Sequence, residues 1–251
     1  MPAAITAETF ERLQRAFCQQ AGWTVSGSQL LTDAQTPAVL CGHRLGRSPD
    51  CPKVIVSAGI HGDEPAGTLA LLEFLEKGGF NDAFEWLIFP ALNPSGLLAG
   101  TRENAELRDV NRDFKSCQSA ESCFYIRQLQ AHDRFDLHLC LHEDWEYEKA
   151  YLYELNSGGS ASISSEVLQV IERCLGLLDA PLIDGHRPTA PGFIHHRLVA
   201  DDPAGWPEAI YLTSRYKLLS YTLETPSQVS LSARVDCMCQ FLQAALSAFV
   251  R

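Results

Sequence analysis

A histidine and a glutamate, three positions apart, follow directly on an apolar and β-branched run of residues. The run Val54–Ser57 leads into Gly59, and His61 and Glu64 come next. A catalytic zinc ion takes three protein ligands of this chemical kind and keeps a fourth position for water. Open α/β sheets also bind ligands outside the carboxyl ends of their strands. We therefore interpret His61 and Glu64 as two ligands of a zinc hydrolase, with ordinary loop residues as the alternative.

A third ligand is expected at the end of a second buried strand, Phe135–Leu141. His142 follows this strand directly. His138 lies on the same face of the strand by period-two alternation, but we expect it to be a core histidine and treat it only as the fallback ligand. Glu143 and Asp144 come next, and they could orient the ligands, favour a positively charged substrate group or bind a second metal.

Two further segments carry groups suited to amide hydrolysis. Glu224 ends the short strand Ser220–Leu223 and is a candidate general base toward a metal-bound water, unless it is an ordinary surface carboxylate. The polar loop Ala99–Ser116 contains three arginines and two asparagines in an otherwise acidic chain. Arginine binds carboxylates in a bidentate manner, so this loop is suited to an anionic substrate. The alternative is a solvated loop whose arginines pair with local acids.

The elements that must position these residues alternate between helices and strands. Apolar periodicity predicts helices over residues 7–20, 67–77, 120–131, 164–178 and 230–249. Strands are predicted over residues 54–57, 84–91, 135–141, 150–155, 211–218 and 220–223, with a further short strand near 38–41 in a turn-rich region. This alternation is typical of an α/β protein with a mainly parallel sheet. We predict one domain over 1–251, with an N-terminal segment 1–51, a motif-bearing core 52–226 and a closing helix 230–249.

Composition limits the classes of partner and the cellular setting. Apolar residues make up 46% and charged residues 20% of the 251 residues, which supports a large core. The net charge of −11 argues against nucleic acid or an anionic membrane as a partner. We see neither a secretory signal nor a membrane span. Nine cysteines without a Cys-x-x-Cys pair favour reduced, mostly buried thiols in a cytoplasmic protein.

The order of the motifs resembles a known family. His-x-x-Glu at 61–64 is followed by Arg102, by Asp-x-Asn-Arg-x-Phe at 109–114, by the strand-end histidine and by Thr-Leu-Glu-Thr at 222–225. This pattern is similar to that of the zinc carboxypeptidases (carboxypeptidase A-like metallopeptidases) and of the related succinylglutamate desuccinylases and aspartoacylases. The resemblance covers residues 52–226. It implies a three-layer α/β/α sandwich around a mixed, mainly parallel sheet of about eight strands.

The resemblance also assigns roles to particular residues. One Zn²⁺ per chain would be bound by His61, Glu64 and His142, and Glu224 would be the general base. Arg102 would polarise the scissile carbonyl. Asn111 and Arg112 would hold the substrate's terminal carboxylate.

The implied activity is hydrolysis of an amide bond next to a free carboxylate in a peptide or peptide-like substrate. Hydrolysis of an N-acyl amino acid is the alternative, and a non-catalytic zinc- or peptide-binding protein is a third reading. The tyrosine that caps the substrate in the family has no secure match. The hydroxyl of Tyr211 or Tyr216 would favour the peptidase if it reached the site. His195 and His196 are either further site contacts or an exposed loop pair.

Overall fold

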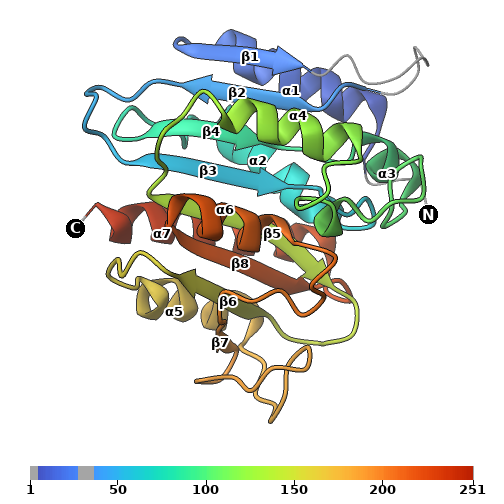
Figure 1. The fold of residues 1–251 in the computed structure, drawn as a ribbon, viewed down its shortest axis with the longest axis vertical. Coiled ribbons are helices and arrows are strands. Elements are labelled where there is room, and N and C mark those ends of the chain that lie inside the picture. The colour runs from blue at the N-terminus through green and yellow to red at the C-terminus, as the bar shows by residue number, and fades with distance from the viewer. Residues whose placement is uncertain (1–4, 28–36, 251) are drawn as a thin grey trace.

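The computed structural model of the chain describes residues 5–27 and 37–250. One mixed sheet has eight strands in the order β1-β2-β4-β3-β5-β8-β6-β7 (Figure 1). The strands are β1 (Trp23–Gly27), β2 (Leu40–Arg44), β3 (Lys53–Ala58), β4 (Glu85–Phe89), β5 (Leu137–Asp144), β6 (Tyr151–Asn156), β7 (Phe193–His195) and β8 (Leu219–Pro226). The helices are α1 (Ala7–Gln19), α2 (Pro65–Glu76), α3 (Pro94–Ala99), α4 (Ala120–Leu129), α5 (Ser164–Leu175), α6 (Glu208–Tyr216) and α7 (Leu231–Phe249), with a 3₁₀ turn at Val110–Arg112.

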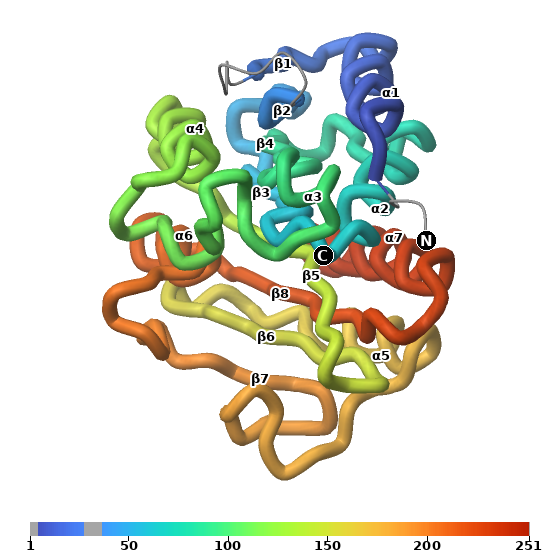
Figure 2. The backbone as a smooth tube through the Cα atoms, turned by 90° about the vertical axis from the view of Figure 1, so that its right-hand side faces the viewer, coloured from blue at the N-terminus to red at the C-terminus, as the bar shows by residue number. Residues whose placement is uncertain are grey.

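Helices cover both faces of the sheet and make a three-layer sandwich. In Figure 2, α4 and α6 lie on one side, and α1, α2, α5 and α7 lie on the other. The four central strands β4, β3, β5 and β8 pair in parallel, whereas β1, β2 and β6 join the sheet through antiparallel pairing. Parallel strands need cover on both faces, which explains their near-continuous apolar sequences. The predicted fold class is thus confirmed.

Successive side chains of β5 face opposite sides of the sheet. Leu137, Leu139 and Leu141 belong to the large apolar core under α1, α2, α5 and α7. The residues that alternate with them, His138 and His142 among them, point to the opposite face. Because side chains alternate along a strand, one face of β5 packs in the hydrophobic core and the other face carries the polar and potentially reactive residues.

Most predicted elements are present with small shifts at their ends. The helices near the N- and C-termini begin and end within two residues of the predicted positions, and β3, β4, β5, β6 and β8 overlap the predicted strands. The strand near 38–41 corresponds to β2, which begins and ends two to three residues later. Residues 28–36 of that turn-rich region lie outside the described residues. The short strands β1 and β7 and the short helix α3 were not predicted, because none carries enough residues to show a period.

The predicted strand 211–218 is wrong, because this segment forms most of α6. Its aromatic and β-branched residues favour a strand, yet Pro207 and Glu208 are signals for a helix start. The Asn111 side chain accepts a hydrogen bond from the Glu208 backbone N–H at 2.9 Å. This contact satisfies a free N–H at the start of the helix from a loop about a hundred residues earlier. The helix or strand propensity of a segment cannot reveal a cap that a distant part of the chain supplies.

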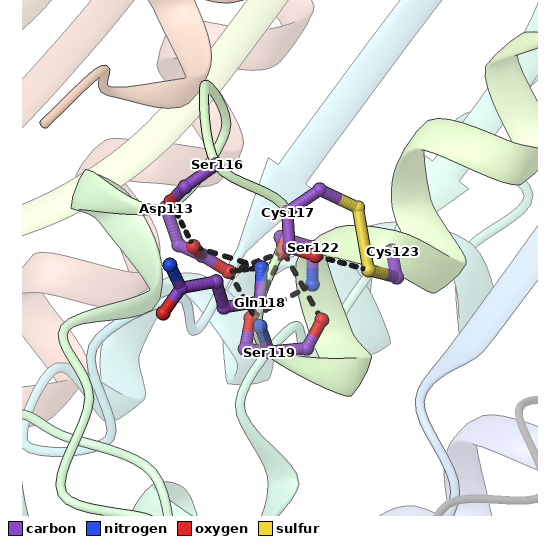
Figure 3. Close-up of a disulfide and its surroundings, with 7 residues drawn as sticks. All are labelled: Asp113, Ser116, Cys117, Gln118, Ser119, Ser122 and Cys123. Carbon is purple, nitrogen blue, oxygen red and sulfur yellow. Dashed lines mark hydrogen bonds between the residues drawn. A yellow bond between two sulfur atoms is a disulfide. The ribbon is translucent and has the colours of Figure 1, made fainter.

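The thiol prediction is correct for most cysteines and wrong for one pair. Cys117 and Cys123 are joined by a disulfide at the start of α4 (Figure 3). The other seven cysteines of the described chain are free, and four of them are buried. Among residues 5–27 and 37–250, no helix has the length and apolar character that crossing a membrane requires.

The carboxylate of Asp113 organises the turn that leads into α4. It accepts hydrogen bonds from the Ser116 and Ser122 hydroxyls, each at 2.6 Å, and from the backbone N–H of Ser119 at 2.6 Å and of Gln118 at 2.9 Å (Figure 3). Burial acts to raise the pKa of Asp113, but the hydrogen bonds from Ser116 and Ser122 outweigh it and lower the pKa to about 2. The turn is therefore stabilised by the charged form of the carboxyl.

We expect Asp113→Asn to lower the free energy of unfolding by about 1.5–3 kcal/mol at pH 7, the usual contribution of a hydrogen bond to a charged group. Because the folded-state pKa is depressed, this stabilisation is complete above about pH 4, the unfolded value, and is lost as the pH falls toward 2. Urea denaturation of both proteins at several pH values measures the difference. A gap between them that does not shrink in acid would contradict the assignment to the charged form.

Candidate metal centre

The three predicted metal ligands come together at the carboxyl ends of neighbouring strands. His61 and Glu64 lie in the loop after β3, and His142 lies near the end of β5, which pairs with β3 in parallel. All three side chains are buried, with relative exposures of 3%, 7% and 3%. They form one of the groups in the described chain whose ligand atoms lie close enough to share a metal ion.

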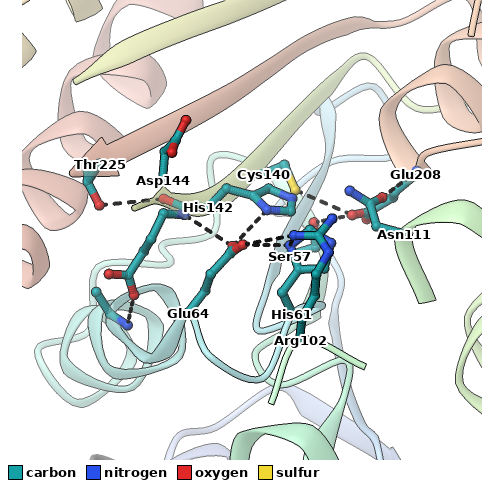
Figure 4. Close-up of polar contacts among 12 residues, drawn as sticks. Ser57, His61, Glu64, Arg102, Asn111, Cys140, His142, Asp144, Glu208 and Thr225 are labelled. Atoms are coloured by element: carbon teal, nitrogen blue, oxygen red, sulfur yellow. Dashed lines mark hydrogen bonds and ion pairs between the residues drawn. The ribbon is translucent and has the colours of Figure 1, made fainter. Parts of the chain in front are cut away.

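The potential metal-binding atoms of these three residues lie close together, around the Glu64 carboxylate. The Glu64 carboxylate lies between the two imidazoles, with Oε1 at 2.6 Å from His61 Nδ1 and Oε2 at 2.8 Å from His142 Nδ1 (Figure 4). Two imidazole nitrogens and one carboxylate are the ligand set of many catalytic zinc sites, in which a fourth position is open. The residues present therefore fit a zinc ion by both chemistry and convergence.

The loop that carries His61 and Glu64 is held by close backbone packing. A Cβ atom on Gly62 would lie only 1.9 Å from the carbonyl carbon of Gly96, so only glycine fits there. Asn93 is fully buried; its side chain accepts from the Gly96 N–H at 2.9 Å and donates to the Arg102 carbonyl at 3.2 Å. Asn93 thereby joins α3 to the arginine loop.

Asp109 is a functional candidate that the sequence interpretation did not single out. Its Oδ1 lies 3.4 Å from His61 Nε2, the nitrogen that faces away from Glu64. A carboxylate in this position fixes the tautomer and orientation of a metal-binding imidazole. Burial acts to raise the pKa of Asp109, but the contact with His61 outweighs it and holds the pKa well below its usual range. In the sequence, the only indication of a role for Asp109 is that it is the first residue of the Asp-x-Asn-Arg-x-Phe motif.

The charges of the three candidate ligands stabilise one another. Burial acts to lower the pKa of His61, but the Glu64 carboxylate outweighs it and raises the pKa to about 9. Burial also disfavours the charged form of His142, and Glu64 again reverses the effect and raises that pKa. Glu64 itself is held charged by the two imidazoles against the cost of burial, with its pKa lowered to about 2.

Arg102 lies beside the ligand atoms and is held there by Asp109. Its Nε and Nη2 donate to Asp109 Oδ2 at 3.1 and 2.9 Å. Its Nη1 is hydrogen-bonded to His61 Nδ1 at 3.3 Å and lies 3.9 Å from Glu64 Oε1 (Figure 4). Asp109 outweighs burial and raises the pKa of Arg102, so the guanidinium stays charged next to the candidate metal position.

Glu224 reaches the same place from the neighbouring strand. It lies directly opposite His142 in the parallel pairing of β5 with β8. Burial raises its pKa to about 8, and the nearby Glu64 and Asp144 carboxylates act in the same direction against the attraction of His142. A carboxyl group whose pKa lies near neutrality is suited to take up and release a proton.

The predicted carboxylate-binding residues follow Asp109 in the 3₁₀ turn. Asn111 Oδ1 is occupied by the Glu208 backbone N–H, so its Nδ2 is the group available as a donor to a ligand. Arg112 is exposed, and one guanidinium nitrogen donates to the Asn111 carbonyl at 2.9 Å. The Arg112 side chain is exposed, whereas Asn111 is fixed by its contact with the Glu208 backbone N–H.

His138 lies in the core, as expected from its place within β5. Its relative exposure is 0%, and its nitrogens lie 2.8 Å from the Ser220 hydroxyl and 3.1 Å from the Ser57 hydroxyl. The Glu208 carboxylate completes this buried network at 3.3 Å from His138 Nε2. Both nitrogens of His138 are thus engaged away from Glu64.

The acidic pair after His142 supports neighbouring elements. Glu143 accepts the backbone N–H of Ala66 in the first turn of α2 at 2.6 Å and forms a buried ion pair with Arg234 of α7. Asp144 accepts the Tyr151 hydroxyl at 2.5 Å. Glu143 therefore connects the end of β5 to two helices, and its oxygens point away from the candidate metal position.

The hydroxyl of Tyr216 is engaged away from the three candidate ligands. Tyr216 donates to the Leu129 carbonyl at 3.2 Å and packs on Phe135, which precedes β5 at the opposite end from His142. Tyr211 packs against Phe114.

The two histidines at 195 and 196 also lie apart from the three ligands, on the outer edge of the sheet. His195 pairs with Glu154 at 3.0 Å, and His196 lies beside His186, with 4.5 Å between ring centroids.

Comparison with known proteins places this centre in a family. Residues 50–175 match the family described as the succinylglutamate desuccinylase/aspartoacylase catalytic domain, a match that spans half of the chain and includes His61, Glu64 and His142. The chain belongs to this family. No curated protein matches the chain.

Solved structures share the fold of this family member at low sequence identity. A candidate metallopeptidase from Shewanella denitrificans is 23% identical, with a TM-score of 0.75 over 96% of this chain and 88% of the other. A metallo-carboxypeptidase from Burkholderia cenocepacia is 16% identical, with a TM-score of 0.71 over 97% of this chain and 69% of the other. A metallo-carboxypeptidase from Pseudomonas aeruginosa, in complex with (2-guanidinoethylmercapto)succinic acid, is 19% identical, with a TM-score of 0.66 over 98% and 70%.

We expect His142→Ala to lose the zinc equivalent bound at this centre and His138→Ala to keep it. His142 Nδ1 points at Glu64, whereas both nitrogens of His138 are used inside the core. Metal analysis of the two purified proteins after dialysis against zinc and then buffer measures this, with circular dichroism as the control for folding. Loss of that equivalent from His138→Ala but not from His142→Ala would transfer the ligand role to His138.

Proposed function

We propose that this family member is a zinc-dependent hydrolase that cleaves an amide bond next to a free carboxylate, as metallocarboxypeptidases do. The observation that carries the proposal is the convergence of His61 Nδ1 and His142 Nδ1 on the Glu64 carboxylate, with Glu224 directly opposite His142. A purely structural zinc site is closed and usually rich in cysteine, which does not describe this donor set.

The mechanism depends on four groups of the chain around the metal. His61, Glu64 and His142 would hold zinc, which would lower the pKa of a bound water to about 7. Glu224 accepts a proton from the attacking water and returns it to the leaving amine. Without a metal, burial raises the pKa of Glu224 to about 8, and a zinc ion bound beside it would lower this pKa toward the range of an ionised base.

Arg102 and the 3₁₀ turn act on the substrate. The Arg102 guanidinium donates hydrogen bonds to the carbonyl oxygen as negative charge develops there, which is where a fixed donor lowers the barrier most. Asp109 holds that guanidinium in place, so little reorganisation is needed. Asn111 Nδ2 and Arg112 bind the substrate carboxylate and set the amide bond against the metal.

Hydrolysis of an N-acyl amino acid is the second candidate, and the family match favours it. The matched family is described by two acyl-releasing activities, desuccinylase and aspartoacylase. The position of Tyr216, far from the ligands, removes one observation that would have favoured a peptidase. Both reactions use the same zinc-activated water and the same carboxylate anchor, so the substrate test decides between them.

Mass spectrometry of a mixture of short peptides and N-acyl amino acids tests the proposal directly. We expect the zinc-loaded protein to release either a C-terminal residue or an acyl group. Glu224→Gln should keep its zinc but turn over at least about a hundredfold more slowly, the low end of general acid–base contributions. Near-normal turnover in Glu224→Gln would remove this residue from the mechanism. No turnover of any member by the wild-type protein would favour the non-catalytic, binding-protein alternative.

We expect Arg112→Gln to raise KM for the substrate that this panel identifies, with a smaller effect on kcat. The reason is that Arg112 is assigned to a carboxylate that does not react, so its contacts are similar in ground and transition states. The C-terminal amide of the same substrate is the matched control, because it lacks the charge that Arg112 binds. An equal loss on acid and amide would contradict carboxylate recognition by Arg112.

A further inference from the structure

A second histidine cluster lies at the outer edge of the sheet, in the long connection between α5 and α6. His186 Nε2 lies 3.2 Å from Asp201 Oδ2, and His196 Nε2 lies 3.9 Å from Asp201 Oδ1. The two rings are in edge contact at 4.5 Å, and one ligand atom from each of the three residues lies within 4.8 Å of the others. Two ligands about 2.1 Å from one tetrahedral zinc ion are roughly 3.4 Å apart, which is close to these spacings.

The backbone around these residues fixes the two imidazoles before any ion binds. His186 ends a tight turn in which Asp184 and Gly185 both have positive φ, at +48° and +77°, and Ile183 and His186 exchange backbone hydrogen bonds at 2.9 and 2.8 Å. Positive φ values at both central residues are characteristic of a type I′ hairpin turn. His196 is held at the end of β7, where its N–H donates to the Glu154 carbonyl at 2.9 Å.

Side-chain contacts orient the same two rings. Tyr153 on β6 meets each ring edge-on, with centroids 5.9 Å apart in both cases. The Tyr153 ring thereby limits how far both imidazole rings can turn.

Two other groups with metal-ligand chemistry in the described chain are less suited to an ion. In the first, Glu85 lies between His43 and His132, but the Lys53 ammonium is 3.5 Å from the same carboxylate oxygen and already supplies a cation. In the second, the buried network of His138, Cys140 and Glu208, the imidazole nitrogens and carboxylate oxygens are already hydrogen-bonded.

We propose that His186, His196 and Asp201 bind a second divalent transition-metal ion, with zinc as the expected occupant. Two imidazoles and one carboxylate suit zinc better than calcium or magnesium, which prefer oxygen ligands. Asp201 is largely exposed, with 75% of its side-chain surface accessible, so a position remains for water. The ion would connect the turn at 183–186 to residues 196–201, two parts of the α5–α6 connection.

The proposed site contacts β6, the strand that pairs with β8, and it shares no residue with the candidate catalytic centre. Tyr153 pairs in register with Thr222, and Tyr151 on the same strand pairs with Glu224. A metal ion bound by His186 and His196 would therefore restrict the motion of the sheet edge next to Glu224. The proposal does not depend on the proposed hydrolase activity.

Zinc stoichiometry, measured by equilibrium dialysis and elemental analysis, tests the second site. We expect about two equivalents in the wild-type protein, about one in the double variant His186→Ala/His196→Ala and about one in His61→Ala/His142→Ala. His195→Ala is the matched control, because it removes a neighbouring imidazole that pairs with Glu154, and it should keep both equivalents. Unchanged binding in His186→Ala/His196→Ala would overturn the proposal, whatever happens at the first site.

Hydrogen exchange gives a second readout that does not depend on total metal. In the wild-type protein, added zinc should slow amide exchange across residues 183–201, and Asp201→Asn should raise the zinc concentration needed for this effect by at least about tenfold. Asp201 is exposed, so its substitution should leave folding intact even if the double histidine variant fails to fold. Zinc that leaves exchange in this segment unchanged would also overturn the proposal.

Discussion

The burial of one carboxylate between two imidazoles is the interaction on which the candidate centre depends. Glu64 is almost inaccessible, and an isolated charge there would be very costly. His61 and His142 compensate for that cost, and zinc would do so more fully. Because His61 follows β3 and His142 is in β5, the contact requires both strands to end at the same edge. The parallel pairing of β3 with β5 meets this requirement.

A second layer of contacts makes the centre rigid. Asp109 contacts both His61 and Arg102, so one carboxylate orients a candidate ligand and a candidate oxyanion donor. Asn93 ties the arginine loop to α3, and Glu143 ties the end of β5 to α2 and α7. Preorganisation of this kind keeps reacting groups in position without a conformational cost during turnover.

The two proposed metal positions differ in ways that suggest different roles. The first is buried at the carboxyl ends of central strands, surrounded by Arg102 and Glu224, and has the groups for chemistry. The second is formed by a tight turn and an exposed aspartate at the edge of the sheet, where an ion would mainly fix a loop. In a chain with a net charge of −11, binding of divalent cations also reduces self-repulsion.

The sequence alone determined the fold class and the candidate ligands, because hydrophobic periodicity and short motifs are local signals. Buried strands such as β3 and β5 need continuous apolar runs, and those runs place His61 and His142 at strand ends. Tertiary structure decided what depends on distant contacts. The helix α6 is capped by Asn111, Asp109 is revealed by its contact with His61, and His186 meets His196 only because the α5–α6 connection folds back over β6. None of these pairs is separated by a regular period, so no pattern in the chain predicts them.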